Sequence, residues 1–70
     1  MKYTYTAKIY LEDGEVILHS GNNVEELMVW MHGQAEASFG DMNGEIIDNK
    51  THHVVKHFQY TPPFSDFTHD

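Results

Sequence analysis

The spacing of apolar residues changes twice along the chain, and this change constrains the fold more than any other feature of the sequence. Between residues 3 and 11, apolar side chains such as Ala7 and Ile9 alternate with polar ones. A period of two is typical of a strand with one buried face. Residues 23 to 39 instead place apolar side chains three or four positions apart, which is the spacing of a helix with one buried side. The chain therefore predicts strands on both sides of a single helix.

A short turn joins the first two strands. Asp13-Gly14 separates the first alternating run from a second strand-like run over residues 15 to 20, and Gly21 ends that run. An Asp-Gly pair in this setting is a strong hairpin signal, because the turn needs a positive φ that glycine adopts freely. We expect an antiparallel hairpin here.

The helix has recognisable signals at both ends. Asn22 and Asn23 are suitable N-caps, and Glu25 and Glu26 follow in the first turn, where the helix dipole favours negative charge. Gly40 is a typical residue for the C-terminal stop. The predicted buried stripe comprises Val24, Leu27, Met28, Met31, Ala35 and Phe39.

A second hairpin is predicted after the helix. We expect a loop over residues 41–44, a short third strand over 45–48 and a turn at 49–50. A long fourth strand then covers residues 51–60, and Pro62-Pro63 ends the sheet because proline cannot donate to the ladder. In this strand Phe58 and Tyr60 favour the inward face.

These elements predict an α+β domain with the order β-β-α-β-β, in which one helix packs on a four-stranded sheet. The domain covers residues 1–61, and residues 62–70 form a tail that is flexible or folded back on the sheet. Short connections favour the spatial order 2-1-4-3, with the first and fourth strands parallel at the centre. Over residues 3 to 60 this element order is similar to the β-grasp of immunoglobulin-binding domains. The similarity is in order and lengths, so it implies a fold and carries no function.

The charge balance excludes some classes of partner. Four lysines and no arginine stand against eleven acidic residues, so the net charge is 4 − 11 = −7. Nucleic-acid binding depends on neutralising phosphates, so we expect no direct binding to DNA or RNA and no binding to anionic membranes. The chain has no cysteine, no signal-peptide pattern and no apolar run of membrane-spanning length. These features predict a cytoplasmic protein.

Acidic residues gather at one end of the predicted fold, where the first hairpin turn and the helix C-terminus meet. The set comprises Glu12, Asp13, Glu15, Glu36, Asp41 and Glu45. One interpretation is a site for a basic protein surface, or a mimic of nucleic-acid charge that occupies a DNA-binding protein. The other is a group of solvated loop acids.

The outer side of the helix offers a second candidate surface. Trp30, Gly33 and Ala37, with Val29 beside them, lie away from the predicted buried stripe. Glycine inside a helix costs about 1 kcal/mol relative to alanine but lets another backbone approach closely. Tryptophan is common at interface hot spots. The alternatives are a contact patch for a homodimer or a foreign partner, or a Trp30 that folds over a sheet edge.

The tail is the third candidate surface. Phe64 and Phe67 stand three residues apart in a polar, acidic segment that follows two prolines. Such a segment resembles a short docking peptide that orders on binding. Alternatively, the two side chains fold back on the sheet face that the helix leaves open.

Catalytic and metal-binding signatures are missing from the sequence. The chain has six histidines, but His53 and His57 lie four residues apart on a strand, about 13 Å at a strand's rise per residue, which is too far to share one zinc ion. No nucleophile turn, phosphate loop or metal-ligand motif is present. We therefore expect no enzyme activity, no cofactor and no metal site.

The leading hypothesis from the sequence is a small acidic, non-enzymatic module that binds and modulates another protein. This profile resembles that of small accessory proteins of mobile elements. The first alternative is a structural or assembly protein that forms a homodimer through the outer helix face or an edge strand. A weaker alternative is histidine-based binding of a metal or a small molecule.

Overall fold

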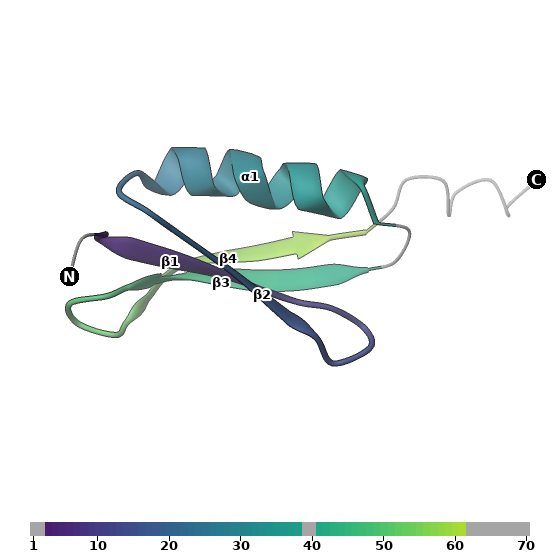
Figure 1. Cartoon of the computed structure of the whole chain (residues 1–70), viewed down its shortest axis with the longest axis horizontal. Coiled ribbons are helices and arrows are strands. Elements are labelled where there is room, and N and C mark those ends of the chain that lie inside the picture. Colours follow the sequence, from purple (N-terminus) through teal and green to yellow (C-terminus); the bar gives the residue numbers. More distant parts are fainter. Residues whose placement is uncertain (1–2, 39–40, 62–70) are drawn as a thin grey trace, which may run out of the picture.

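The computed structural model describes residues 3–38 and 41–61. One helix lies across one face of a single four-stranded sheet, as Figure 1 shows. The elements are β1 (Tyr5–Tyr10), β2 (Val16–Gly21), α1 (Val24–Glu36), β3 (Met42–Asp48) and β4 (Val54–Tyr60). The predicted α+β class and the β-β-α-β-β order are confirmed.

The order of strands across the sheet differs from the prediction. The observed order is β2-β1-β3-β4 and every neighbouring pair is antiparallel, so the expected 2-1-4-3 order with a parallel central pair is wrong. β1 pairs with β3 along its whole length, from Tyr5 opposite Asp48 to Tyr10 opposite Asn43. The arrangement therefore lacks the parallel centre of a β-grasp sheet.

The reason lies in the length and burial of β3. The strand starts at Met42, so the loop predicted over residues 41–44 is wrong for most of its length. Met42, Gly44 and Ile46 alternate on the buried face, which gives β3 the apolar side that a central strand needs. β4 exposes most of its residues and therefore takes the edge.

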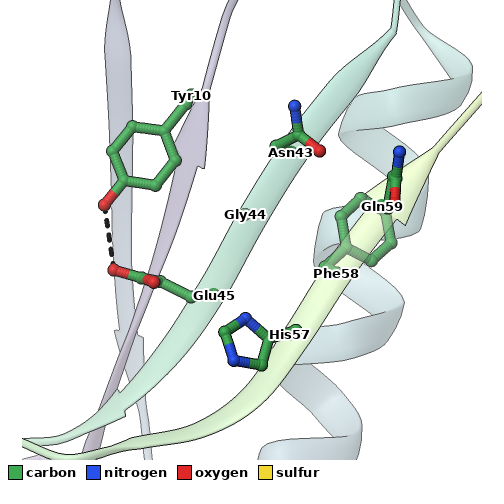
Figure 2. Close-up of a pocket in the computed structure, with 7 residues that line it drawn as sticks. All are labelled: Tyr10, Asn43, Gly44, Glu45, His57, Phe58 and Gln59. Atoms are coloured by element: carbon green, nitrogen blue, oxygen red, sulfur yellow. Dashed lines mark hydrogen bonds between the residues drawn. The ribbon is translucent and has the colours of Figure 1, made fainter.

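Gly44 lets β3 lie directly below the helix. It lies between β1 and β4, opposite Ile9 on one side and Phe58 on the other (Figure 2). A Cβ at this position would come within 2.5 Å of the Lys8 carbonyl oxygen and within 2.5 Å of the Met31 Cε atom. Any larger residue would push apart two strands or the helix and the sheet.

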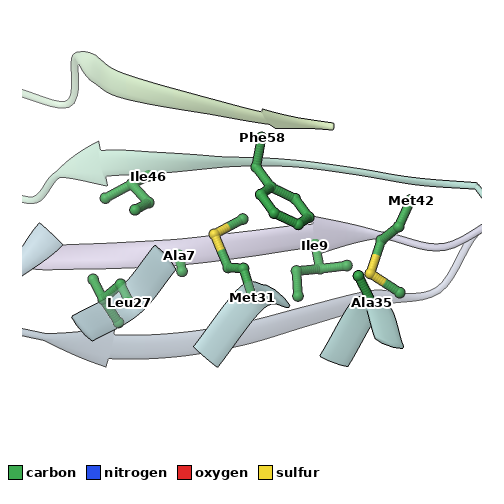
Figure 3. Close-up of a cluster of buried hydrophobic side chains, with 8 residues drawn as sticks. All are labelled: Ala7, Ile9, Leu27, Met31, Ala35, Met42, Ile46 and Phe58. Carbon is green, nitrogen blue, oxygen red and sulfur yellow. The ribbon is translucent and has the colours of Figure 1, made fainter. Parts of the chain in front are cut away.

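The core lies between α1 and the covered face of the sheet (Figure 3). The helix contributes Leu27, Met31 and Ala35, all members of the predicted stripe. Phe58 is buried, which confirms the predicted inward face of β4. The complete set of buried apolar residues is Ala7, Ile9, Leu27, Met31, Ala35, Met42, Ile46 and Phe58.

The ends of α1 follow local hydrogen-bonding rules. The Asn23 side chain accepts a hydrogen bond from the Glu26 backbone N–H at 3.0 Å, so the predicted N-cap is confirmed. The helix ends at Glu36, earlier than the predicted residue 39, because the Ser38 N–H donates to the Ala35 carbonyl and tightens the last turn. The predicted stop at Gly40 and the stripe residue Phe39 lie outside the described residues.

Both hairpin turns place one residue in the left-handed region. Gly14 has φ +93° in the first turn, as the Asp-Gly pair predicts. The second turn covers residues 49–52 and is longer than predicted, because the Asp48 carboxylate accepts bonds from two backbone N–H groups that follow it. His52 occupies the left-handed position of that turn with φ +66°.

Candidate functional site

The sheet face opposite α1 carries exposed apolar side chains. Register places Val16 beside Tyr10 and Leu18 beside Lys8, all on the side opposite the buried Ile9. Leu18 is 60% exposed, Val16 47% and Tyr10 40%. We call this surface the open face. Exposed apolar side chains that gather on one face of the described part of the chain are a candidate interaction site.

A shallow cavity of about 340 Å³ lies on the open face and continues the row that contains Tyr10 (Figure 2). The Tyr10 hydroxyl donates a hydrogen bond to the Glu45 carboxylate at 2.9 Å. This bond, with burial and the negative charge of Glu45, raises the pKa of Tyr10. The cavity is lined by Tyr10, Asn43, Gly44, Glu45, His57, Phe58 and Gln59.

Most of the predicted acidic set lies together. The β1–β2 turn, the C-terminal end of α1 and the start of β3 lie at the same end of the molecule (Figure 1). This end, which we call the acidic end, carries the exposed residues Glu12, Asp13, Glu15, Glu36 and Asp41. Asp13 also has a local role, because its carboxylate accepts a hydrogen bond from the Glu15 backbone N–H at 2.9 Å.

Glu45 lies apart from these loop acids. It is half-buried on the open face, opposite Lys8, and its carboxylate is hydrogen-bonded to Tyr10. The structure therefore assigns it to the cavity on the open face rather than to the acidic end. The link between Tyr10 and Glu45 requires the β1–β3 register, which the predicted strand order did not contain.

Trp30 packs over the edge of the sheet. Its ring stacks on the His19 ring of β2, with centroids 4.6 Å apart and an angle of 21° between the planes. Gly33 and Ala37 are exposed on the same helix, and a Cβ at Gly33 would meet no atom within 4 Å. Val29 is 71% exposed. The Trp30 ring therefore makes a contact within the chain, whereas Gly33 and Ala37 beside it remain exposed on the helix surface.

A second histidine contact lies on the other side of the helix. The His32 ring meets the Phe58 ring of β4 edge-on, with centroids 5.0 Å apart. From the sequence, the histidines are expected to be scattered surface residues, and neither aromatic contact is predicted. Both contacts join residues far apart in the chain, so no local pattern indicates them.

Phe64 and Phe67 lie outside the described residues. Within residues 3–38 and 41–61, no group of three histidine or acidic side chains is close enough to hold a metal ion. In the same ranges, no helix has the length and apolar character to cross a membrane.

Comparison with models of known protein families, with curated proteins and with solved structures finds no match to this chain.

Proposed function

We propose that this protein is a non-enzymatic interaction module that binds and modulates another protein with a basic surface. The observation that supports this most directly is the position of the exposed apolar residues. Val16 and Tyr10 of the open face adjoin the turn that carries Glu12, Asp13 and Glu15. An apolar centre with a charged border is a common composition of protein–protein interfaces.

The charge of the chain indicates the chemistry of the partner. With a net charge of −7 and a cluster of exposed acids at one end, the protein attracts surfaces rich in lysine and arginine. Such attraction accelerates association at low salt and weakens as salt screens it. The partner in this proposal is therefore a protein with basic residues around a small apolar contact.

The proposal assigns no cofactor and no nucleic-acid or membrane ligand. Four lysines are too few to neutralise a run of phosphates against eleven acidic side chains. The cytoplasm is the proposed location, since a chain without cysteine suits a reducing compartment.

The test compares two variants that remove the same number of charges from different ends of the molecule. Asp13→Asn with Asp41→Asn neutralises two acids of the acidic end, and the amide oxygen that replaces the Asp13 carboxylate can still accept the turn hydrogen bond. Glu25→Gln with Glu26→Gln is the matched control in the first turn of α1. The tagged wild type and both variants are used to capture proteins from the source cells at low and high salt, and a captured protein is then purified and titrated.

The proposal expects a partner with a basic surface that binds the wild type and the control alike and is released at high salt. Neutralising the acidic end should weaken its affinity and flatten the salt dependence. Equal affinity and equal salt dependence for all three proteins would overturn the assignment of the acidic end. A partner that loses affinity only on truncation of Trp30 would instead favour the helix surface.

A further inference from the structure

β2 is an edge strand that lacks the usual protection against pairing with another strand. Natural edge strands carry charges, prolines or bulges that prevent such pairing. β2 has the sequence VILHSG, without a charge or a proline, and its register with β1 is continuous from Val16 to Gly21. The opposite edge, β4, carries Lys56 and a register shift opposite Ile46 and Ile47. Within residues 3–38 and 41–61, β2 is therefore the edge that is open to a further strand.

The hydrogen-bond pattern shows which backbone groups of β2 point outward. The Leu11 N–H donates to the Glu15 carbonyl at 2.9 Å, so these two residues form a hydrogen-bonded pair at the turn. Bonded and non-bonded pairs alternate along an antiparallel ladder. Ile17, His19 and Gly21 consequently bond to β1. The remaining residues Val16, Leu18 and Ser20 direct their N–H and C=O groups away from the sheet.

We infer that β2 pairs with β2 of a second copy of this chain, antiparallel and centred on Leu18, to form one continuous eight-stranded sheet. In this register Leu18 lies opposite Leu18 of the second copy, and Val16 lies opposite Ser20 of the second copy. All three outward residues then exchange both of their backbone bonds, about six bonds in total for three bonded pairs. A shift of two residues in either direction would leave one of the three without a partner.

The register suits two copies of an acidic chain. No charged residue of β2 faces another, because the strand has none, and Glu15 at its end comes opposite Gly21 of the second copy. Like charges directly opposite one another would destabilise the pairing. At the centre, two leucines that are 60% exposed in the single chain cover each other. The outward edge of β2 is therefore complementary to the same edge of a second copy.

The helices leave room for this arrangement. α1 contacts all four strands of its sheet to a similar extent and so lies near the middle of the sheet, which would separate the two helices by about four strand spacings, roughly 19 Å. Packed helices lie about 8–10 Å apart, so these two would not collide. The Trp30–His19 stacks from both copies would lie in the space between them. The exposed Gly33 and Ala37 add no bulk on that side.

This inference does not depend on the proposed function, although Val16 belongs to both surfaces. Antiparallel pairing places the two acidic ends at opposite sides of the dimer and leaves both exposed. The two tests can be told apart, because Asp13→Asn with Asp41→Asn leaves β2 unchanged and the Leu18 variants leave the acidic end unchanged.

The experiment measures molar mass in solution by sedimentation and light scattering. The chain has a mass of 8.1 kDa, so the expected dimer has 2 × 8.1 = 16.2 kDa. Leu18→Pro removes an N–H that makes no bond within the chain's own sheet, which an edge strand tolerates. Leu18→Glu is a second variant that keeps the N–H, lies opposite Lys8 in its own sheet and places like charges opposite each other in the dimer. Both should sediment at 8.1 kDa with the wild-type circular dichroism spectrum.

A matched control lies on the other edge. The Asp48 N–H donates to the His53 carbonyl at 2.9 Å, so even-numbered residues of β3 bond to β4. His57, opposite Glu45, therefore also directs its backbone outward. His57→Pro makes the same change on the β4 edge and should leave the dimer intact.

Amide hydrogen exchange of the wild type tests the β2 pairing directly, so the inference can be tested even if a variant fails to fold. In the dimer the amides of Val16, Leu18 and Ser20 should exchange slowly, and dilution should remove this protection. A wild-type chain that remains at 8.1 kDa up to about 1 mM, the weak end of specific affinities, would overturn the inference. So would a dimer that persists in both Leu18 variants, or one in which the Leu18 amide exchanges freely.

Discussion

Replacement of Gly44 by alanine tests the close approach at the centre of the sheet. The added Cβ would lie 2.5 Å from the Lys8 carbonyl oxygen and 2.5 Å from the Met31 Cε atom. The Met31 methyl group ends a flexible side chain and can rotate away. The Lys8 carbonyl belongs to the backbone of β1, so it can move only if the two central strands separate.

The magnitude follows from the displacement that is needed. Real Cβ contacts essentially never fall below 3.0 Å, so at least 3.0 − 2.5 = 0.5 Å of separation between β1 and β3 is required. Overpacking of this kind costs about 1–3 kcal/mol. Alanine recovers about 0.5–1 kcal/mol of glycine's entropy cost, which leaves a net loss of about 0–2.5 kcal/mol, with a centre near 1 kcal/mol. A domain of 70 residues is stable by roughly 3.5–10 kcal/mol, so this loss is easily measured.

The assay is urea unfolding followed by circular dichroism, with Gly33→Ala as the control. The same chemical change at Gly33 meets open space on an exposed helix, so it should stabilise the fold by about 1 kcal/mol. With a slope of about 1 kcal/mol per molar urea, the urea midpoint of Gly44→Ala should lie about 1 M or more below that of Gly33→Ala. A Gly44→Ala midpoint that rises above the wild type as far as that of Gly33→Ala would refute the close approach.

Three further predictions concern single contacts. Asn23→Ala removes the acceptor for the Glu26 N–H and should lower the free energy of unfolding by about 1 kcal/mol in urea unfolding, whereas Asn23→Ser should retain most of it. His52→Gly relieves a left-handed conformation at φ +66°, so it should raise the free energy of unfolding by about 0.5–1 kcal/mol and the thermal midpoint with it. An unchanged thermal midpoint would contradict this prediction. The pKa of Tyr10 is raised in the folded state. Its neutral hydroxyl therefore contributes fully to the free energy of unfolding below the ordinary pKa of 10.0, and this contribution is lost as pH rises through the folded pKa. Tyr10→Phe should therefore flatten the loss of stability at alkaline pH, and an unchanged pH profile would show that the bond to Glu45 has no such effect.

The elements of this fold were predictable because each depends on neighbours in the sequence. The helix follows from apolar spacing and the Asn23 cap, and the first hairpin follows from Asp13-Gly14 and a positive φ at Gly14. The error at residues 41–44 has a physical cause. Asn-Gly is a typical turn pair, yet Gly44 serves here as the one residue small enough to lie below Met31.

The candidate surfaces were predictable to a different extent. To predict the acidic end, it was enough to know that the first turn and the helix C-terminus lie at the same end of the molecule. Any antiparallel hairpin followed by this helix has that arrangement. The sequence separates Trp30 from the buried stripe, whereas in the structure Trp30 is partly buried against the core and stacks on His19, which lies eleven residues earlier on another element. The sequence predicts a sheet face that the helix leaves open, but the cavity on that face is lined by β1, β3 and β4 and depends on which strands are neighbours, so no local pattern in the sequence identifies it.

The type and order of the elements, the net charge and the position of the acidic end follow from the amino-acid sequence alone. Those properties depend on local backbone preferences and on the side chains present. Tertiary structure alone decided which strand lies beside β1, and with it the Tyr10–Glu45 bond and the identity of the edges. Strand order is set by which strand buries its apolar side best below the helix, and that competition is between residues distant in the chain. Here the buried Met42, Gly44 and Ile46 placed β3 at the centre and left β2 at the edge.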